Sequence, residues 1–455
     1  MPGRTTHETQ DKMLTPLPHQ VEDARYMASR TGTTGNFSGM GTGKTVTTLE
    51  ALRIARDTQP AVQSLIIAPP IALQMWADSV EAQLGVTSQI LKTGKTRIDE
   101  SVAVVVVSYA IAAKRLDLHR KWLAVIADES HALKSVESKR TRAIIGSRGI
   151  IRGATYFWPL TGTPIVRHAD DLYPFLVNAD KDGMRTRCGS LDKARFDLQF
   201  CITQTKQYHP RQKPKRVVVG SRRGDELRDW VYGTGLAVRR TLADVWDKMP
   251  PLNKSTLRCP LTMTPELRVA LKALEGMPLS QVEKALQDGD PNMAATRRLI
   301  GESKVKAAAD FLIEEIEAGT GPILVGLWHR SVSSALRDLL TDKGIKVQVL
   351  DGSTSLARKG QLQDDFNAGR LDVLLGQISS MGVSLNLQAG GNRIVTVEED
   401  WSPTIMDQFF ARLHRMGQEK AVFVQRLVAD NKIDAAVGRV SARKARFAAA
   451  VSQGM

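Results

Sequence analysis

Residues 39–45 read Gly-Met-Gly-Thr-Gly-Lys-Thr, and a helical pattern from Val46 to Arg56 follows them directly. Glycines at this density let the backbone wrap phosphate groups closely, while backbone N–H groups and a helix start supply positive potential. In such a loop Lys44 would reach the β- and γ-phosphates, and the Thr45 hydroxyl would hold Mg²⁺. The stretch therefore predicts a nucleotide-binding loop between a short strand and a helix.

The strict form of this motif has glycine where the chain has Ser38, and the preceding strand pattern, near residues 36–38, is short. A Gly-rich turn alone is a weak signal, so the prediction depends on its surroundings. The residues expected to line the nucleotide are the loop's own members: Met40, Gly41, Thr42, Gly43, Lys44 and Thr45.

A second pattern lies downstream, where the apolar run Leu123 to Ala127 ends in Asp128-Glu129-Ser130-His131. Carboxylates at the C-terminal end of a parallel strand face the crevice where ligands bind in open α/β sheets. Asp128 can hold the Mg²⁺ shell, and Glu129 can orient or deprotonate the attacking water. A strand-end pair of this kind is more often a solvated turn, but the upstream loop favours the catalytic interpretation.

Short β-rich apolar runs alternate with helical patterns in two parts of the chain. The runs lie at residues 65–68, 102–109, 123–127 and 156–160, and again at 322–328, 347–350, 372–376, 393–398 and 422–428. The intervals leave room for crossover helices, which predicts parallel sheets with helices on both faces. We therefore predict an α/β fold with two lobes.

The predicted organisation has four parts: an N-terminal tail at 1–13, an ATP-binding lobe at 14–245, a helical linker or brace at 246–305, and a second lobe at 306–455 that ends in a basic helix. The middle of the chain, about 177–305, shows no β alternation. It holds a basic, Pro-marked stretch from Lys206 to Arg223, which is either a solvated surface or a nucleic-acid contact.

Composition narrows the class of partner. The chain has 63 Lys and Arg against 48 Asp and Glu, a net charge of +15, which favours a polyanion. No apolar run approaches the ~18 residues that a membrane helix needs, so a membrane partner is not expected. The three cysteines form no C-x-x-C pair, which argues against disulfides and zinc and favours a reducing compartment, the cytoplasm.

The order of the motifs resembles that of superfamily 2 helicases: the Gly-rich loop, then D-E-S-H at 128–131, then L-T-G-T-P at 160–164. Three later stretches are similar to segments of the Snf2 family, namely D-G-S-T-S at 351–355, G-V-S-L-N-L at 382–387 and Q-F-F-A-R-L-H-R-M-G-Q at 408–418. Trp76, W-S-P at 401–403 and the Arg239-Arg240 pair also match. The chain thus resembles the Snf2 core over about residues 14–435.

This resemblance implies two RecA-like lobes, ATP and Mg²⁺ as ligands, and site residues beyond the loop. Gln20 matches the family's adenine-reading glutamine, with an ordinary surface glutamine as the alternative. Arg412 and Arg415 match its finger arginines, which reach the γ-phosphate from the second lobe when the cleft closes. The alternative for this pair is a salt-bridge face on a helix.

The resemblance also implies residues that couple nucleotide state to nucleic acid: His131, Thr161, Thr163 and Gln408. Gly382 is expected at the nucleotide, and Asn386 on the interlobe face or near the bound strand. His414 can equally be structural. The implied catalytic set is Lys44, Asp128, Glu129, Arg412 and Arg415.

We predict an ATP-driven motor that moves along double-stranded DNA without separating its strands. The alternatives are a strand-separating DNA or RNA helicase, and a nucleic-acid clamp that uses ATP as a switch with little hydrolysis. Aromatic residues are only 5% of the chain, which disfavours single-strand binding by stacking. The reduced insertions suggest a near-minimal motor from a bacterium or phage rather than a nucleosome remodeller. The oligomeric state stays open, and a monomer is compatible with the pattern.

Overall fold

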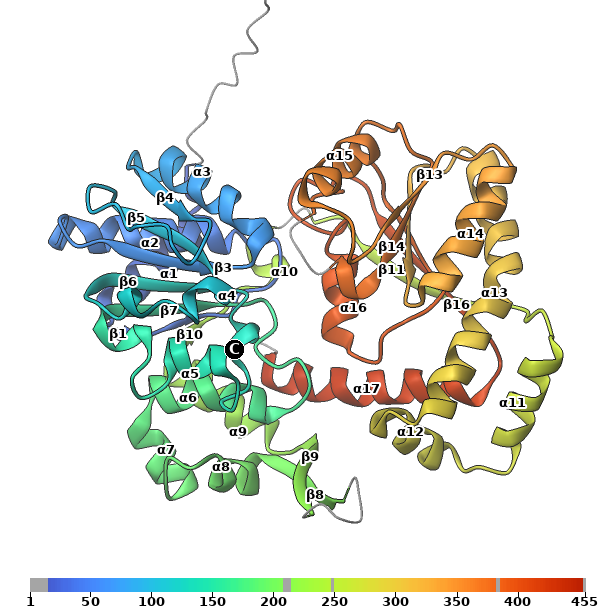
Figure 1. The fold of residues 1–455 in the computed structure, drawn as a ribbon, viewed down its shortest axis with the longest axis horizontal. Helices are drawn as coiled ribbons and strands as arrows, with labels where there is room; N and C mark the ends of the chain where they lie inside the picture. The colour runs from blue at the N-terminus through green and yellow to red at the C-terminus, as the bar shows by residue number, and fades with distance from the viewer. Residues whose placement is uncertain (1–14, 208–213, 247–248, 382–384, 453–455) are drawn as a thin grey trace, which may run out of the picture. The chain divides into compact units, whose positions relative to one another are not determined.

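The computed structural model describes residues 15–207, 214–246, 249–381 and 385–452. Contacts divide the chain into two compact units. The first lobe comprises Met1–Pro164 and Ala169–Arg240, and the second lobe comprises Ile165–His168 and Thr241–Met455. Figure 1 colours the chain from blue at the N-terminus to red at the C-terminus.

The first lobe is built on a parallel sheet of eight described strands. In spatial order these are β10 (Ala237–Val238), β2 (Gly35–Asn36), β7 (Ala154–Leu160), β6 (Trp122–Asp128), β3 (Ser64–Ala68), β5 (Val104–Ser108) and β4 (Ser88–Leu91), with β1 (Gly32–Thr33) also paired to β7. The four long runs predicted from the sequence all form strands of this sheet.

Helices cover both faces of this sheet, which is why its strands are apolar throughout. On β3, Ile66 and Ala68 face one core while Leu65 and Ile67 face the other, as the two-residue period of a strand requires. The first core packs against α1 (Pro18–Ser29), α2 (Lys44–Thr58) and α3 (Leu73–Leu84). The second core packs against α4 (Tyr109–Ala112) and α5 (Lys139–Ile145). Burial on both faces produces the continuous runs that predicted these strands.

The first lobe also contains a helical region after β7. It consists of α6 (Tyr173–Ala179), α7 (Lys181–Cys188), α8 (Lys193–Phe200) and α9 (Gly224–Arg228). The described cysteines, Cys188, Cys201 and Cys259, are buried free thiols.

The second lobe has a parallel sheet of six described strands. Their order is β11 (Leu252–Arg258), β16 (Val422–Val428), β15 (Arg393–Thr396), β12 (Ile323–Leu327), β14 (Val373–Gln377) and β13 (Val347–Leu350). One face packs against α13 (Pro291–Glu317) and α14 (Arg330–Asp342), and the other against α15 (Leu356–Asn367) and α16 (Pro403–Phe410). The predicted fold class, two α/β lobes with parallel sheets, is thereby confirmed.

A helical segment of the second lobe packs against the C-terminal helix. It comprises α11 (Pro265–Glu275), α12 (Leu279–Asp288) and the start of α13, which share a core with α17 (Lys432–Ser452). Glu283 on α12 lies 3.1 Å from Arg439 and 3.2 Å from Arg443. Part of the basic character of α17 is therefore neutralised within the lobe. The short α10 (Leu242–Val245) precedes β11.

The prediction that the middle of the chain lacks strands is wrong in two places. Strands β8 (Cys201–Lys206) and β9 (Lys215–Ser221) form an antiparallel hairpin in the first lobe. Strand β11 lies inside the segment predicted as a helical linker and pairs with β16 at the edge of the second sheet. β11 has mostly polar, exposed residues, and β8 and β9 have few fully buried ones, so the alternation that marks a half-buried strand is missing.

Among the residues that the structure describes, none of the helices is long and apolar enough to cross a membrane.

Candidate active site

The phosphate loop is shaped by two glycines. Gly41 and Gly43 have φ angles of 77° and 85°, in the left-handed region that glycine adopts without steric cost. Helix α2 begins at Lys44 and has no side-chain cap at its N-terminus. Its first N–H groups and the positive end of its dipole are therefore suited to an anion.

Lys44 is folded over this loop. Its Nζ donates to the carbonyl oxygens of Ser38, at 3.0 Å, and Gly39, at 2.9 Å. The Thr42 hydroxyl also donates to the carbonyl of Gly39, at 2.9 Å. The loop thus holds its lysine in place through its own backbone, and phosphate oxygens can take over these hydrogen bonds.

The substitution of serine for glycine at position 38 has a structural explanation. Ser38 Oγ accepts from the backbone N–H of Arg240, at 3.1 Å, and the Gly39 N–H donates to the carbonyl of Arg240, at 2.7 Å. The Arg240 guanidinium donates to Asp23 on α1 at distances of 2.8 to 3.2 Å. The loop, α1 and the end of β10 are therefore joined by residues more than 200 positions apart in sequence.

Gln20 lies against the loop. Its side chain is buried, with Oε1 accepting from the Leu17 N–H at 2.9 Å and Nε2 donating to the carbonyl of Thr42 at 3.3 Å. A Cβ at Gly43 would lie only 2.1 Å from Gln20 Nε2, so this contact needs glycine there. The surface alternative for Gln20 is wrong, and its adenine-reading role stays a prediction.

Asp128 ends strand β6 and is held at three points. Trp76 Nε1 donates to its Oδ2 at 2.9 Å, the Glu129 N–H donates to its Oδ1 at 3.0 Å, and the Tyr109 hydroxyl donates to its backbone carbonyl at 2.6 Å. Burial and the charge of Glu129 raise the pKa of Asp128 to about 6, against the lowering effects of Trp76 and Lys44. Leu160 on β7 pairs with both Asn36, which precedes the phosphate loop, and Asp128, so the loop and the acidic strand end lie at the same edge of the sheet.

Glu129 has a left-handed backbone with φ of 51°, which is uncommon for a residue other than glycine. Strain of this kind persists where the surrounding structure requires it, and it concentrates at functional sites. The side chain of Glu129 is 34% exposed, and its Oε2 lies 3.2 Å from His131 Nδ1. A partly exposed carboxylate of this kind can reach a water molecule.

The T-G-T-P segment lies directly beside the phosphate loop. The Thr161 N–H donates to the carbonyl of Asn36 at 3.1 Å, and Thr161 Oγ1 accepts from the Thr163 N–H at 3.1 Å. A Cβ at Gly162 would lie 3.0 Å from Met40 Cγ and 3.5 Å from Lys44 Nζ. The absence of a side chain at Gly162 thus lets this segment approach the loop closely, which is the geometry a coupling segment needs.

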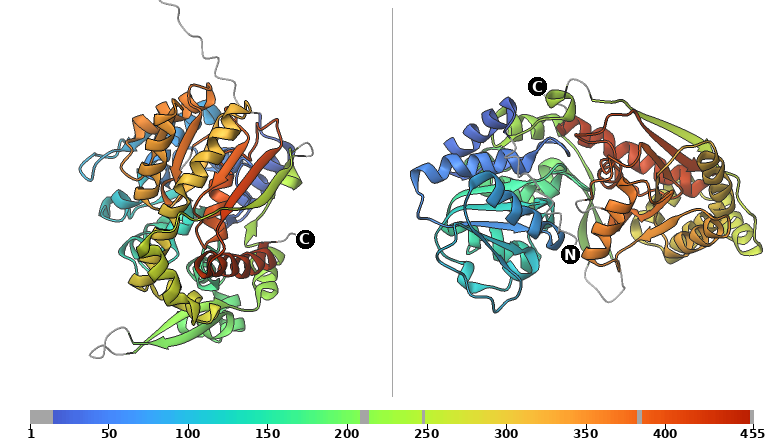
Figure 2. Two further views of the ribbon diagram at one scale, coloured as in Figure 1. Left: turned by 90° about the vertical axis from the view of Figure 1, so that its right-hand side faces the viewer. Right: turned by 90° about the horizontal axis from the view of Figure 1, so that it is seen from above.

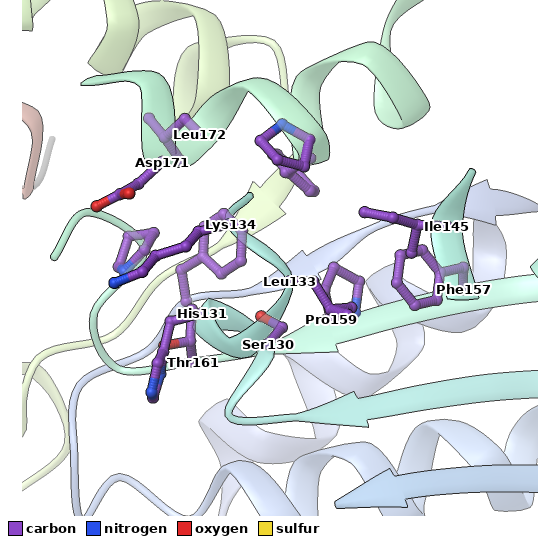
Figure 3. Close-up of a pocket in the computed structure, with 14 residues that line it drawn as sticks. Ser130, His131, Leu133, Lys134, Ile145, Phe157, Pro159, Thr161, Asp171 and Leu172 are labelled. Carbon is purple, nitrogen blue, oxygen red and sulfur yellow. The ribbon is translucent and has the colours of Figure 1, made fainter. Parts of the chain in front are cut away.

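A pocket is lined by residues of both the acidic strand end and the T-G-T-P segment (Figure 3). Its polar lining includes Ser130 and His131 from the acidic strand end and Thr161 from the T-G-T-P segment. Ile145 and Phe157 contribute to its apolar end. Movement of either motif would therefore change the shape of this pocket.

In the second lobe, Arg412 and Arg415 follow α16 instead of lying on it. Arg412 is buried, and its Nε donates to the carbonyl of Gln408 at 3.1 Å. Arg415 donates to the carbonyl of Leu385 at 3.4 Å and to the side-chain oxygen of Asn386. Both acceptors of Arg415 are neutral, and burial lowers the pKa of this guanidinium.

Other arginines in the chain have carboxylate partners. Arg240 pairs with Asp23, and Arg426 pairs with Glu399 at 2.6 Å, and the hydrogen bonds to these carboxylates raise the pKa of both guanidinium groups. Arg415 therefore does not fit the salt-bridge alternative. A half-buried cation with no carboxylate partner among the described residues favours an anionic ligand.

The remaining predicted residues differ in where they lie in the structure. Gln408 is buried on α16, and His414 Nε2 lies 2.9 Å from the carbonyl of Pro250, consistent with a structural histidine. Gly382 lies outside the described residues. The Asn386 N–H donates to Gln363 Oε1 at 2.7 Å.

Mg²⁺ in nucleotide sites takes one or two protein oxygens, with phosphate and water completing its shell. The Asp128 carboxylate and the Thr45 hydroxyl are donors of that kind, so the residues present fit the ion. Within the described ranges, no cluster of three or more His, Cys, Asp or Glu residues could hold a metal by itself.

Sequence reasoning missed the hydrogen bonds made by Trp76 and Arg240, although both residues were noted as matches. Trp76 reaches Asp128 across 52 positions, and Arg240 reaches Asp23 across 217. A separation of that size leaves no local pattern, so only the fold reveals these contacts.

Comparison with known proteins gives two family matches. The SNF2-related domain matches residues 19–267, more than half of the 455 residues, and the helicase conserved C-terminal domain matches residues 303–417.

Among curated relatives, "SWI/SNF-related matrix-associated actin-dependent regulator of chromatin subfamily A-like protein 1" of Xenopus tropicalis is 23% identical over 427 residues, covering 92% of this chain and 43% of that protein. "DNA repair and recombination protein RAD54-like" of Drosophila virilis is 27% identical over 489 residues, covering 92% of this chain and 60% of that protein. The chain thus spans about two fifths to three fifths of the length of these relatives. The solved Sulfolobus solfataricus SWI2/SNF2 ATPase core domain is 18% identical with a TM-score of 0.43, covering 94% of this chain and 89% of that one.

Proposed function

The chain belongs to the SNF2-related family and carries a helicase C-terminal domain, and from that premise we propose that it is an ATP-driven double-stranded DNA translocase. It would hydrolyse ATP to ADP and phosphate and move along the duplex without separating the strands. We propose that it acts in a reducing compartment, the cytoplasm, in keeping with its three free cysteines. A bacterial or phage source is also part of this proposal.

The observation that carries the proposal is the convergence of three motifs in the first lobe. Gly162 brings the T-G-T-P segment against Met40 and Lys44, and the charge of Lys44 acts on Asp128. A nucleotide-binding loop, an acidic strand end and a coupling segment therefore lie together at one edge of the first sheet, where Leu160 pairs with both Asn36 and Asp128. A simple nucleotide-binding protein has no need for the third of these.

This geometry supports the following hydrolytic roles. Lys44 exchanges its carbonyl partners for phosphate oxygens, and the open N-terminus of α2 adds positive potential. Glu129 orients and deprotonates the attacking water. Asp128 and Thr45 hold Mg²⁺, which when bound neutralises charge on the phosphates. Arg412 and Arg415 are proposed to stabilise the negative charge that develops in the transition state.

Three observations support double-stranded DNA as the nucleic acid along which the protein moves. The net charge is +15, which attracts a polyanion. The relatives include proteins named for chromatin regulation and for DNA repair and recombination. Aromatic residues, on which single strands stack, are only 5% of the chain.

The deciding experiment compares the ATPase rates of the full chain with duplex DNA, single-stranded DNA and RNA at matched nucleotide concentration, alongside a strand-separation assay. The expected result is a low rate alone, strong stimulation by duplex DNA and little strand separation. Stimulation by RNA alone, or efficient unwinding of a blunt duplex, would instead support the helicase alternative.

Glu129→Gln serves as the control for hydrolysis, because the amide keeps the shape of the side chain but cannot act as a base. This variant is expected to bind nucleotide and to turn it over roughly 10²–10⁴-fold more slowly. Duplex-dependent nucleotide binding with no hydrolysis in the parent protein would favour the clamp alternative.

A further inference from the structure

The β8–β9 hairpin stands apart from the rest of the first lobe (Figures 1 and 2). Its base packs on the lobe: Cys201 is buried, Ser221 Oγ accepts from the Ala169 N–H at 2.8 Å, and the Arg222 N–H donates to the carbonyl of Phe200 at 2.9 Å. Further along, Gln204, Thr205 and Arg216 are exposed. The hairpin is therefore anchored at one end and presents its strands to solvent.

The charge of this segment is one-sided. From residue 198 to residue 224 the sequence has seven Lys and Arg residues and no Asp or Glu. On the described strands these include Lys206, Lys215 and Arg216. Glu137 lies 4.0 Å from Lys215, but the two side chains are 80% and 68% exposed, and a pair of that kind contributes little.

The register of the hairpin places like charges together. Lys206 is directly opposite Lys215, and Thr205 is opposite Arg216. Like charges at directly opposed positions destabilise a strand pair. The acceptor for Arg216 Nε is the neutral hydroxyl of Thr203, at 2.7 Å. An external anion lying along the strands would relieve this repulsion.

The form of the hairpin favours a duplex over a single strand. A two-stranded β-ribbon has the width that the major groove of B-DNA admits. The described strands contain no aromatic side chain on which a base could stack. The basic surface also continues beyond Glu137 onto α5, where Lys139 and Arg142 are exposed.

We propose that the β8–β9 hairpin is a DNA-gripping arm that binds the phosphate backbone of a duplex through Lys206, Lys215 and Arg216. This proposal rests on the proposed function, because it assigns part of the track-binding surface of the motor. An acidic protein surface is the other occupant of matching charge, and the experiment below separates the two.

The test uses the full chain, a duplex of about 30 base pairs, and salt from about 50 to 200 mM, a range over which phosphate contacts weaken measurably. The triple variant Lys206→Ala/Lys215→Ala/Arg216→Ala is compared with Lys92→Ala/Lys95→Ala/Arg185→Ala, which removes the same charge from exposed sites elsewhere on the first lobe. Each lost phosphate contact lowers the slope of log affinity against log salt by about 0.9. The hairpin triple is expected to lower it by about 2–3, while the control triple matches the parent.

A single variant separates binding from folding. Lys215→Glu places a carboxylate opposite Lys206, so its melting temperature should equal or exceed that of the parent while duplex affinity falls. If the parent binds duplex DNA and both hairpin variants keep its salt slope, the DNA-binding role of the hairpin is wrong, whereas the proposed translocase function is unaffected. If the parent shows no duplex binding and no stimulation by any nucleic acid, both proposals are overturned.

Discussion

The two lobes share an architecture but hold their functional residues differently. In the first lobe Lys44 donates to two loop carbonyls, Asp128 accepts from Trp76, and Gln20 donates to Thr42. These groups are fixed by partners within the lobe. In the second lobe Arg415 lies after the end of α16 and is half-buried, and its acceptors among the described residues are neutral oxygens.

This difference separates two kinds of contribution to catalysis. Groups that are already positioned bind the ground state, whereas a buried cation without a carboxylate gains most when negative charge develops beside it. Substitution of Lys44 in the first lobe should therefore affect nucleotide binding together with turnover. Substitutions of the second-lobe arginines should affect turnover alone.

The largest expected effect comes from Lys44→Ala. Loss of the ammonium removes binding energy from the phosphates, so nucleotide affinity and ATP turnover should both fall, turnover by more than about 10³-fold. The melting temperature should stay near that of the parent, because the carbonyls of Ser38 and Gly39 that accept from Lys44 lie on the loop and not in the core. Lys92→Ala is the control for removing an exposed lysine. A near-normal ATPase rate in a folded Lys44→Ala protein would show that this loop does not bind the phosphates of ATP.

Arg415→Ala tests whether the second-lobe arginines contribute to turnover and not to nucleotide binding. Stimulated turnover should fall by about 10³-fold, with nucleotide affinity changed little, since a finger arginine acts chiefly in the transition state. Arg412→Ala should behave similarly. Arg426→Ala, which breaks an ion pair with Glu399, should instead lower the melting temperature. Early melting of Arg415→Ala with unchanged turnover would make this arginine structural.

Trp76→Phe tests whether Asp128 must be held in place. Hydrogen bonds to charged groups are worth about 1.5–3 kcal/mol, so turnover should fall roughly 10- to 100-fold and more Mg²⁺ should be needed for half-maximal rate. Trp158→Phe is a matched control, because Trp158 lies in the same core and its indole N–H has no hydrogen-bond partner among the described residues. Equal effects of the two variants would mean that only packing matters.

The smallest effect concerns pH and stability. The folded state raises the pKa of Asp128 from 3.8 to about 6, so between these values the folded protein binds more protons than the unfolded chain. The contribution of Asp128 to the free energy of unfolding is therefore present at low pH and is lost as pH rises through about 6. Without nucleotide, Asp128→Asn should melt above the parent near pH 7.5, and the gap should narrow below about pH 6 and close near the unfolded pKa of 3.8. A gap independent of pH would contradict the raised pKa.

The buried parts of the fold could be predicted because burial leaves a local pattern. Strands β3, β5, β6 and β7 are covered on both faces, and their continuous apolar runs identified them. Strands β8, β9 and β11 lack such a continuous buried run: β11 packs only Leu252 and Leu257 against the second-lobe cores, and its other residues are polar. The same reasoning applies to the candidate site: its residues were predicted from local motifs, whereas the support that Trp76 gives Asp128 and that Arg240 gives α1 comes from contacts between distant segments.

The link between Ser38 and Arg240 has a mechanical consequence. Arg240 is the last residue of the first lobe before the chain enters the second lobe at Thr241. A pull on the chain at that point is borne first by the two hydrogen bonds that join Arg240 to Ser38 and Gly39, and these residues also hold Lys44. Force on the connection therefore reaches the phosphate loop directly. We expect the hydrolysis rate to depend on load, and Ser38→Ala to weaken that dependence in a single-molecule stall measurement.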